Sequence, residues 1–438
     1  MKNIASINRQ ILHLAIPSML AGITIPLVGM ADTAIAGRLG SAAAIGGIAI
    51  GSMLFDLLYW NFGFLRISTA GLTAQAYGRH DMGSAVRCGL QGLASAWAIS
   101  LLILLIQWPF AQLMLWLTPA SPQVEIVARQ YFFIRIWAAP AVLPLFVFRG
   151  WFIGMQNTIA SMIMDIVINV LNVGLSIVLA MHCGMGVKGI ALGTLISQYT
   201  GLLCGFILLL VYYKPLKSYV TFRHSFPWQE VKRFFTLSGN IFIRSLCMLF
   251  IYNGFTMLAA HYGDTLLAVA TIMMKLLLLY GYIVDAFAYA GEALVGKSIG
   301  ANDKPALRLS IKWLFVWGVG VGIISTVLYV VGDQWLLRAM TSTPEVIAAA
   351  QPFLPWLYSM PFISCLTFMW DGIYIGATAG SAMRNTMILS VIAFYLCYFL
   401  FRGIWGIQAL WIGYAAHLVV RSLFQTVWAR KHVYGKIT

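Results

Sequence analysis

The chain has 438 residues, of which 61% are hydrophobic and only 9% are charged, and its formal net charge is +15. A typical soluble domain carries about 25% charged residues, and a disordered chain has low hydrophobicity, so both classes are excluded. The basic excess does not indicate nucleic acid, because no segment is long enough to form a soluble domain with a solvated basic face. We therefore expect a multi-spanning helical membrane protein with short loops.

Twelve hydrophobic runs follow one another, each long enough for the roughly 20 residues that cross a bilayer as a helix. They lie near 11–36, 46–76, 88–107, 125–150, 158–181, 188–212, 234–260, 266–294, 308–332, 346–374, 384–402 and 407–428. The first run contains Pro17, Pro26 and Asp32 and no small-residue cleavage site, so it is interpreted as a span and not as a signal peptide. The longest polar stretch, 212–234, ends in FPWQEVKRFF, which predicts an interfacial helix. The predicted organisation is an N-terminal lobe (1–212), a cytoplasmic linker (213–233) and a C-terminal lobe (234–438).

Lysine and arginine are distributed unevenly between alternate loops. With the N-terminus inside, 17 of the 28 basic residues fall in inner loops and tails. The outer loops hold only Arg38, Lys188, Arg338 and Arg402. Because cytoplasmic loops carry the excess of Lys and Arg, both termini are predicted to be cytoplasmic.

The two halves of the chain repeat at one constant offset in residue number. Pro122, Gly150 and Gly154 correspond to Pro344, Gly372 and Gly376, and GRHD ending at Asp81 corresponds to GAND ending at Asp303. An even number of spans per repeat predicts parallel repeats, which in transporters enclose the substrate site and rock around it. The predicted fold is therefore an all-α membrane protein, with twelve transmembrane helices in two pseudo-symmetric six-helix bundles around a central cleft. Channels more often assemble from several subunits, so we expect a monomeric transporter.

Asp32 is a carboxylate toward the outer end of the first run. A charge at that depth costs about 2.5–3.5 kcal/mol on insertion scales, which usually indicates a functional role and is removed when the acid takes up a proton. The alternative is a structural carboxylate that hydrogen-bonds to a neighbouring helix. Pro17 and Pro26 on the same helix each remove a backbone donor and are hinge candidates, or else static kinks.

The fifth run contains Asn169, Asn172 and Ser176, spaced so that they share one helix face. With Thr194 of the sixth run they predict a hydrogen-bonded pocket that tunes Asp32. The alternative is polar contact between helices, which is common in membranes.

Five charged residues lie within the runs of the second half: Arg244, Lys275, Asp285, Glu292 and Asp371. Unpaired buried ions are costly, so these residues are expected to form a charge network. Structural pairing and a role in coupling or substrate binding remain equal alternatives for this C-lobe network.

GEALVGKS (291–298) matches the P-loop pattern, but the phosphate-binding chemistry needs a strand before the loop. A long apolar helix precedes it here, so we expect no nucleotide binding and interpret Lys297 as an inner anchor. The six cysteines are scattered and form no C-x-x-C pair, so neither a metal site nor a disulfide framework is predicted. No hydrolase motif is visible, and no enzymatic activity is expected.

Several segments together resemble the multidrug and toxic compound extrusion (MATE) family, and within it the DinF-type branch. They are PLVGMADTAIAGRLG, RISTAGLTAQAYG, GVKGIALGTLISQY, DAFAYAGEALVGKSIG and WDGIYIGATAGSAMRNTM. The resemblance implies two bundles around a cleft and export of cationic or amphipathic drugs in exchange for H⁺ or Na⁺. It also implies that Asp32 is the acidic residue of the first helix, Pro17 its bend-forming proline and Asn172 the asparagine of the fifth helix. Ser176 departs from the family pattern, because many relatives have an aspartate there.

The sequence thus predicts a proton-coupled exporter of amphipathic or cationic xenobiotics in a bacterial inner membrane. It uses no cofactor, and its coupling ion is H⁺, with Na⁺ as the alternative. A flippase for lipid-linked precursors is the second hypothesis; it needs a strongly basic cleft, and the first-half spans offer only Arg66, Arg135 and Arg149. A scaffold or receptor is the third, and it leaves the intramembrane acids unexplained.

Overall fold

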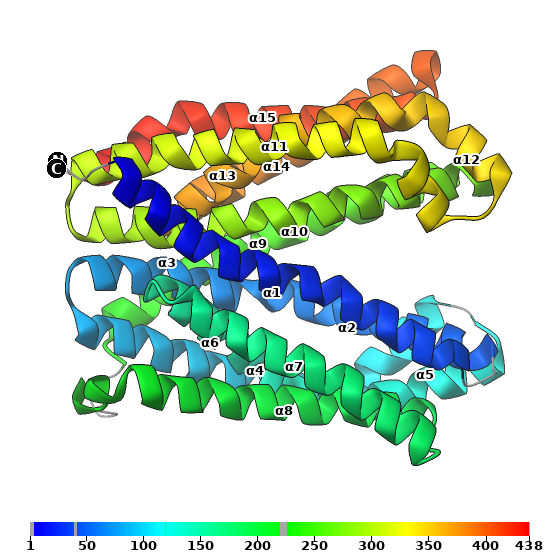
Figure 1. The fold of residues 1–438 in the computed structure, drawn as a ribbon, viewed down its shortest axis with the longest axis horizontal. Coiled ribbons are helices and arrows are strands. Elements are labelled where there is room, and N and C mark those ends of the chain that lie inside the picture. Colours follow the sequence, from blue (N-terminus) through cyan, green and yellow to red (C-terminus); the bar gives the residue numbers. More distant parts are fainter. Residues whose placement is uncertain (1–3, 39–41, 119, 220–225, 438) are drawn as a thin grey trace. The chain divides into compact units, whose positions relative to one another are not determined.

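The computed structural model describes residues 4–38, 42–118, 120–219 and 226–437. Within these ranges the chain is helical and has no strand, which confirms the all-α fold class (Figure 1). Eleven helical segments of the described chain are long and apolar enough to cross a membrane. The twelfth predicted span is α15, which contains His417, Arg421 and Gln425 and is correspondingly less apolar.

The first half contains eight α-helices, because two of its six spans are each broken into two. They are α1 (Ile4–Arg38), α2 (Ala42–Trp60), α3 (Phe64–Gly78), α4 (Met82–Leu117), α5 (Pro122–Arg135), α6 (Ala139–Gly154), α7 (Thr158–Ile177) and α8 (Val187–Tyr212). Short 3₁₀ turns, η1 (Asn61–Gly63) and η2 (Ile136–Ala138), divide the second and fourth spans, and a π-helical turn, η3 (Val178–His182), extends α7.

The second half follows the same order with one break. Its helices are α9 (Trp228–Ala260), α10 (Asp264–Gly300), α11 (Lys304–Met340), α12 (Pro344–Ala350), α13 (Leu354–Gly376), α14 (Gly380–Trp405) and α15 (Gln408–His432). The turn η6 (Gln351–Phe353) separates α12 from α13, as η2 separates α5 from α6. The turns η4 (Lys214–Tyr219) and η7 (Tyr434–Lys436) follow α8 and α15.

The interfacial helix predicted in the linker is not a separate element. WQEVKRFF of this segment instead provides the first turns of α9, which runs without interruption from Trp228 to Ala260. The physical reason is that Pro227 directly precedes the first turn, where its missing N–H costs nothing. No proline follows within 228–260 to interrupt the helix.

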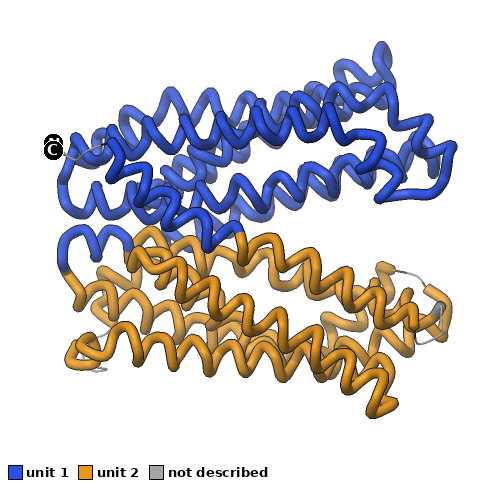
Figure 2. The backbone as a smooth tube through the Cα atoms, viewed as in Figure 1, with its two compact units in different colours: residues 1–19, 74–80, 235–438 blue, residues 20–73, 81–234 orange. Residues whose placement is uncertain are grey.

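The helices form two compact units (Figure 2). Unit 1 contains residues 1–19, 74–80 and 235–438, and unit 2 contains residues 20–73 and 81–234. The unit boundary at 234/235 lies beside the predicted start of the C-terminal lobe. Two segments of the first half, the beginning of α1 and the end of α3, nevertheless belong to unit 1.

The sequence repeat is reproduced in local geometry. Asp81 caps α4 by accepting a hydrogen bond from the Ser84 N–H, and Asp303 caps α11 in the same way from Ala306. The residues before these caps, His80 and Asn302, both have positive φ, and so do the equivalent pair Gln156 and Thr378. Equivalent turns and caps at the offset of the sequence repeat thus show that the two halves share one supersecondary pattern.

Glycine allows close helix packing at equivalent places in each unit. In unit 2 a Cβ on Gly150 of α6 would overlap the Arg66 carbonyl of α3, and in unit 1 a Cβ on Gly372 of α13 would overlap the Ala288 carbonyl of α10. Arg66 and Ala288 are themselves equivalent positions of the repeat. The helix crossings of the two halves are therefore built on the same backbone contacts.

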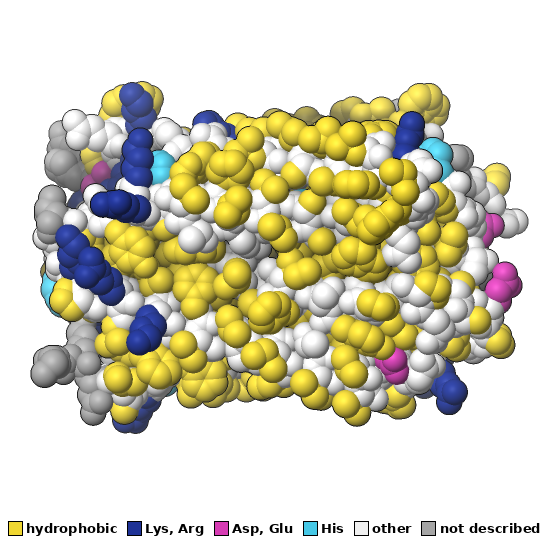
Figure 3. All heavy atoms as spheres, turned by 90° about the horizontal axis from the view of Figure 1, so that it is seen from above, with side chains coloured by type: hydrophobic (Ala, Val, Ile, Leu, Met, Phe, Trp, Pro, Cys, Tyr) yellow, Lys and Arg dark blue, Asp and Glu magenta, His cyan; other side chains and the backbone are white. Residues whose placement is uncertain are grey.

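Apolar side chains cover much of the face drawn in Figure 3. Leu105 on α4 and Val331 on α11 are 72% and 82% exposed, and many other large apolar side chains are also exposed. Most basic side chains on the face drawn lie toward the helix ends at which the chain begins and terminates. An apolar belt with basic side chains at its edge is typical of helices that span a bilayer.

Candidate functional site

Asp32 lies on α1 within unit 2 and is 9% exposed. Its Oδ1 has no hydrogen-bond partner in the described structure. Leaving an ionised acceptor buried in this way is costly, and most buried polar groups in proteins are paired. The Asp32 carboxyl thus has one buried acceptor oxygen to which no donor of the described structure is directed.

The predicted pocket residues of α7 and α8 meet in the same unit. Asn172 Nδ2 donates to Thr194 Oγ1 at 3.0 Å, and Thr194 Oγ1 donates in turn to the Ile190 carbonyl. Among the described residues, this chain of donors leaves the Asn172 Oδ1 as a buried acceptor without a partner. The geometry thus brings Asn172 and Thr194 together, as either a pocket or polar contact between helices requires.

Ser176 is fully buried one helical turn beyond Asn172 and is a polar neighbour of the Asp32 carboxyl. Within the described part of the chain its hydroxyl makes no hydrogen bond of normal geometry. Gly193 of α8 permits the close approach of α7, because a Cβ at Gly193 would lie only 2.9 Å from the Ser176 Oγ. A π-helical turn begins two residues later, and such turns are frequent at functional sites.

Asn169 occupies a different place from Asn172. Its Nδ2 donates to Thr24 Oγ1 of α1, and Thr24 donates to the Ala21 carbonyl. Pro26 follows Thr24 by two residues inside α1, so α7 holds α1 next to the predicted hinge. Pro17, the other hinge candidate, belongs to the part of α1 in unit 1.

Arg135 and Asp56, which sequence reasoning did not assign to the site, lie in the same unit. The Arg135 guanidinium at the end of α5 interacts electrostatically with both Asp32 and Asp56. Asp56 is the sole acid of the run 46–76, and that isolation is the signal by which it could have been found. A third acid of this unit, the half-buried Asp165, is paired with Arg149 at 2.6 Å.

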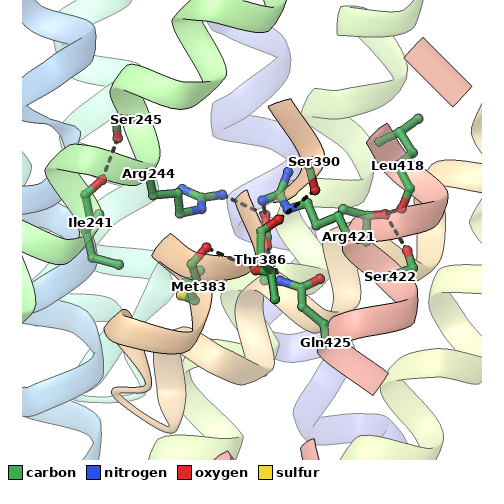
Figure 4. A network of polar contacts seen from close by, with 12 residues as sticks. Ile241, Arg244, Ser245, Met383, Thr386, Ser390, Leu418, Arg421, Ser422 and Gln425 are labelled. Carbon is green, nitrogen blue, oxygen red and sulfur yellow. Dashed lines mark hydrogen bonds and ion pairs between the residues drawn. The ribbon is translucent and has the colours of Figure 1, made fainter. Parts of the chain in front are cut away.

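In unit 1, Asp371 of α13 is the centre of a buried polar network (Figure 4). Arg244 Nη2 of α9 donates to the Asp371 Oδ2 at 2.7 Å, and Arg421 Nη2 of α15 donates to the same oxygen. Gln425 Nε2 donates to the Asp371 Oδ1 at 3.0 Å. Both carboxylate oxygens are thus occupied by donors, in contrast to Asp32.

The other three residues of the predicted C-lobe network all lie on α10. Lys275 is exposed on α10, whereas Glu292 is 1% exposed and Asp285 half-buried on the same helix. Within the described residues, the hydrogen bonds and ion pairs of Asp371 come from Arg244, Arg421 and Gln425 and not from these three. Of the predicted charges, Arg244 and Asp371 form a direct ion pair, and Asp285 and Glu292 also take part in polar or electrostatic contacts.

Sequence reasoning did not single out Arg421 and Gln425 of the final apolar run. His417, Arg421 and Gln425 are spaced by four residues, which places them on one face of α15. That spacing is the sequence signal for a buried polar face. The GEALVGKS segment, by contrast, lies inside α10 and is helical throughout.

Comparisons with known proteins agree over most of the chain. A family model described as MatE matches residues 17–178 and 241–401. DNA damage-inducible protein F of Escherichia coli (strain K12) is 33% identical over 98% of this chain and 93% of its own length. Multidrug and toxin extrusion protein 1 of Danio rerio is 23% identical over 98% of this chain and 73% of its own length. A solved MOP superfamily transporter from Pyrococcus furiosus covers 100% of this chain and 99% of its own, with a TM-score of 0.87 and 17% identity, so it shows the fold alone.

Proposed function

Because the chain belongs to the MatE family of multidrug and toxin extrusion transporters, we propose that it is a secondary active exporter. Its cargo is an amphipathic or cationic drug or toxin, which it exchanges for H⁺ by alternating access. The names of its relatives, including the multidrug and toxin extrusion protein of Danio rerio, support that cargo class. The protein performs no catalysis of its own and works as a monomer in a bacterial inner membrane, with both termini cytoplasmic.

The observation that carries the proposal is the contrast between two buried carboxylates. Asp371 accepts from two guanidinium groups and an amide, whereas the Asp32 Oδ1 accepts from nothing in the described structure. A carboxylate oxygen to which no donor is directed can take up a proton or contact a cationic cargo, and the proton and the cargo compete for it. Asp32 is therefore the coupling residue, and Asp371 is a structural one.

The cycle follows from this competition. Ionised Asp32 attracts a cationic cargo from the cytoplasmic side. After the transporter opens outward, a proton neutralises Asp32 and the cargo leaves. Asn172, Ser176 and Thr194 line the carboxyl with neutral polar groups, and Asn169 holds α1 beside Pro26, where the helix bends.

The driving force is sufficient for useful export. A charge crossing 100 mV is worth about 2.3 kcal/mol and a pH unit about 1.36 kcal/mol, so a proton supplies roughly 3.7 kcal/mol. For a neutral cargo this sustains a gradient of several hundred-fold, since about 1.4 kcal/mol corresponds to a factor of ten. For a monocation, whose exit against the potential cancels the electrical contribution, the pH unit alone sustains about tenfold. The alternative coupling ion is Na⁺. Asp32, Asn172 and Ser176 each have a buried oxygen without a hydrogen-bond partner in the described chain, and hard cations prefer oxygen ligands.

The test is cargo-induced proton movement in proteoliposomes, for the wild type and Asp32→Asn, with and without sodium. We expect the wild type to move protons without sodium and the variant to lose that movement. Glu125→Gln is the matched control, because Glu125 is a surface carboxylate paired with Arg129. Equal proton movement in wild type and Asp32→Asn would contradict the assignment of Asp32. No response to any amphipathic cation would favour a flippase for lipid-linked precursors instead.

A further inference from the structure

The first turns of α11, in unit 1, carry three basic side chains at a constant spacing of four residues. They are Lys304, Arg308 and Lys312, and all three are exposed. Residues four apart on a helix lie on neighbouring parts of one face, so the three form a basic stripe about 12 Å long. In the part of the chain that the structure describes, no carboxylate forms an ion pair with any of them. We call these three residues the α11 stripe.

The acids nearest in sequence do not balance the α11 stripe. The next acid along the helix is Asp333, close to its opposite end. Asp303 directly precedes Lys304, but its Oδ1 accepts the hydrogen bond from the Ala306 N–H that caps the helix. Three positive charges and this one negative charge leave a net charge of +2. The helix dipole disfavours positive charge at an N-terminus, so helix stability does not explain three basic residues there.

The corresponding helix of the first half has no such stripe. At the offset of the sequence repeat, Met82, Val86 and Leu90 of α4 occupy the positions of the three basic residues. Both helices nevertheless begin with the same aspartate cap. The arginine that α4 does carry near its start, Arg87, is bound to Glu230. The shared supersecondary pattern therefore does not require basic side chains at these positions of α11.

The exposed face of α11 becomes apolar directly beyond the stripe. Val316, one turn after Lys312, is 49% exposed, and Ile323 and Val327 further along are 50% and 54% exposed. In Figure 1, α11 starts near the end at which the chain begins and terminates. Figure 3 shows basic side chains toward that end of the face drawn and apolar side chains beyond them. A ligand on this face of α11 therefore meets positive charge at one end and an apolar surface along the rest.

We propose that this face of α11 binds an anionic phospholipid, with the headgroup phosphate at the α11 stripe and an acyl chain along Val316, Ile323 and Val327. Ammonium and guanidinium groups form strong, charge-assisted hydrogen bonds with phosphate oxygens. A soluble anion would leave the apolar continuation of the face unused. With the termini cytoplasmic, as proposed above, the stripe lies in the cytoplasmic leaflet, whose anionic lipids attract basic segments beside a span. The inference does not depend on what the protein exports.

The experiment measures lipid binding to the full-length protein in uncharged detergent, by native mass spectrometry. The probes are phosphatidylglycerol and phosphatidylcholine with identical acyl chains, and glycerol 3-phosphate as the free anionic headgroup. We expect wild type to bind phosphatidylglycerol at least about tenfold more tightly than phosphatidylcholine, since each basic residue near a lipid surface contributes about fivefold. The variant K304Q/R308Q/K312Q should bind the two lipids within about twofold of each other.

The matched control is K214Q/K217Q/K232Q, which removes three exposed basic residues of predicted inner segments in unit 2. This control should keep the wild-type preference for phosphatidylglycerol. Phosphatidylglycerol should also raise the melting temperature of wild type and of the control, but not that of K304Q/R308Q/K312Q, because a ligand stabilises only the protein that binds it.

Three results would overturn the inference. The first is a wild type without preference for phosphatidylglycerol, or a stripe variant that keeps the preference. The second is an equal loss of preference in the two triple variants, because net charge and not the α11 stripe would then select the lipid. The third is competition by glycerol 3-phosphate at the same concentration as the lipid, because the stripe would then take a soluble anion. None of these results bears on the exporter function, which proton movement tests separately.

Discussion

Gly78 on α3 and Gly300 on α10, which are equivalent positions of the repeat, each lie against the backbone of the other's helix in unit 1. A Cβ on Gly78 would overlap the Lys297 carbonyl, and a Cβ on Gly300 would overlap the Gln75 carbonyl. Gln75 and Lys297 are also equivalent positions, so α3 and α10 contribute equivalent residues to the two sides of this contact. Nearby, Gln75 Nε2 donates to the Gly376 carbonyl at 3.0 Å and so fixes the end of α3 against α13.

This reciprocal contact predicts that neither glycine tolerates a side chain. We expect Gly78→Ala and Gly300→Ala each to lower stability by about 1–3 kcal/mol, because a methyl group there must displace backbone. Thermal unfolding in detergent measures the effect. Gly320→Ala is the control, since a Cβ at Gly320 meets nothing within 4 Å. Equal melting temperatures for Gly78→Ala and Gly320→Ala would show that the helices can separate at no cost.

Asp371 should matter for stability more than for coupling. Asp371→Asn removes the counter-charge of Arg244 and Arg421, both of which are buried, and breaking a buried pair costs about 3–5 kcal/mol. We expect a large drop in the melting temperature, and partial recovery in D371N/R244Q, which removes one of the uncompensated guanidinium groups. Asp264→Asn, at the exposed first residue of α10, should leave the melting temperature nearly unchanged. A stable Asp371→Asn variant that no longer moves protons would instead assign Asp371 to coupling.

Pro26 should affect transport through the bending of α1. Replacing Pro26 with alanine restores a backbone donor inside a 35-residue helix and makes it harder to bend. We expect Pro26→Ala to slow export at least fivefold in proteoliposomes while unfolding at the same temperature as wild type or higher. Pro109→Ala, inside α4, is the matched control and should leave the rate unchanged. A wild-type export rate for Pro26→Ala would exclude hinge bending at this residue.

The ion pair between α4 and the start of α9 should contribute little. Arg87 binds Glu230 through two hydrogen bonds of 2.9 Å, but the two side chains are 28% and 36% exposed. Exposed pairs are worth about 0–1 kcal/mol and weaken with salt. We expect Glu230→Gln to lower stability by no more than about 1 kcal/mol, with a smaller difference at high ionic strength. A larger, salt-independent loss would mean that the pair is effectively shielded from solvent.

The sequence by itself determined the fold class, the number of spans and the repeat. These features depend on hydropathy averaged over the length of one span and on turn residues at a fixed offset, both of which are local properties of the chain. Asp81 and Asp303 illustrate this, because a cap is decided by the residues that immediately follow it. Asp32, Asn172 and Thr194 could also be singled out, since a polar residue in an apolar run is conspicuous without any structure.

Only the tertiary structure decided which charges meet. Arg244, Asp371 and Arg421 come from three helices far apart in sequence, and no spacing rule joins them, whereas Lys275 is near in sequence to Asp285 but lies exposed. Arg135 and Asp56 were likewise brought to the Asp32 unit by the packing of α5 against α2. The physical reason is that electrostatic partnership depends on distance and burial after folding, which local patterns of residue types do not encode.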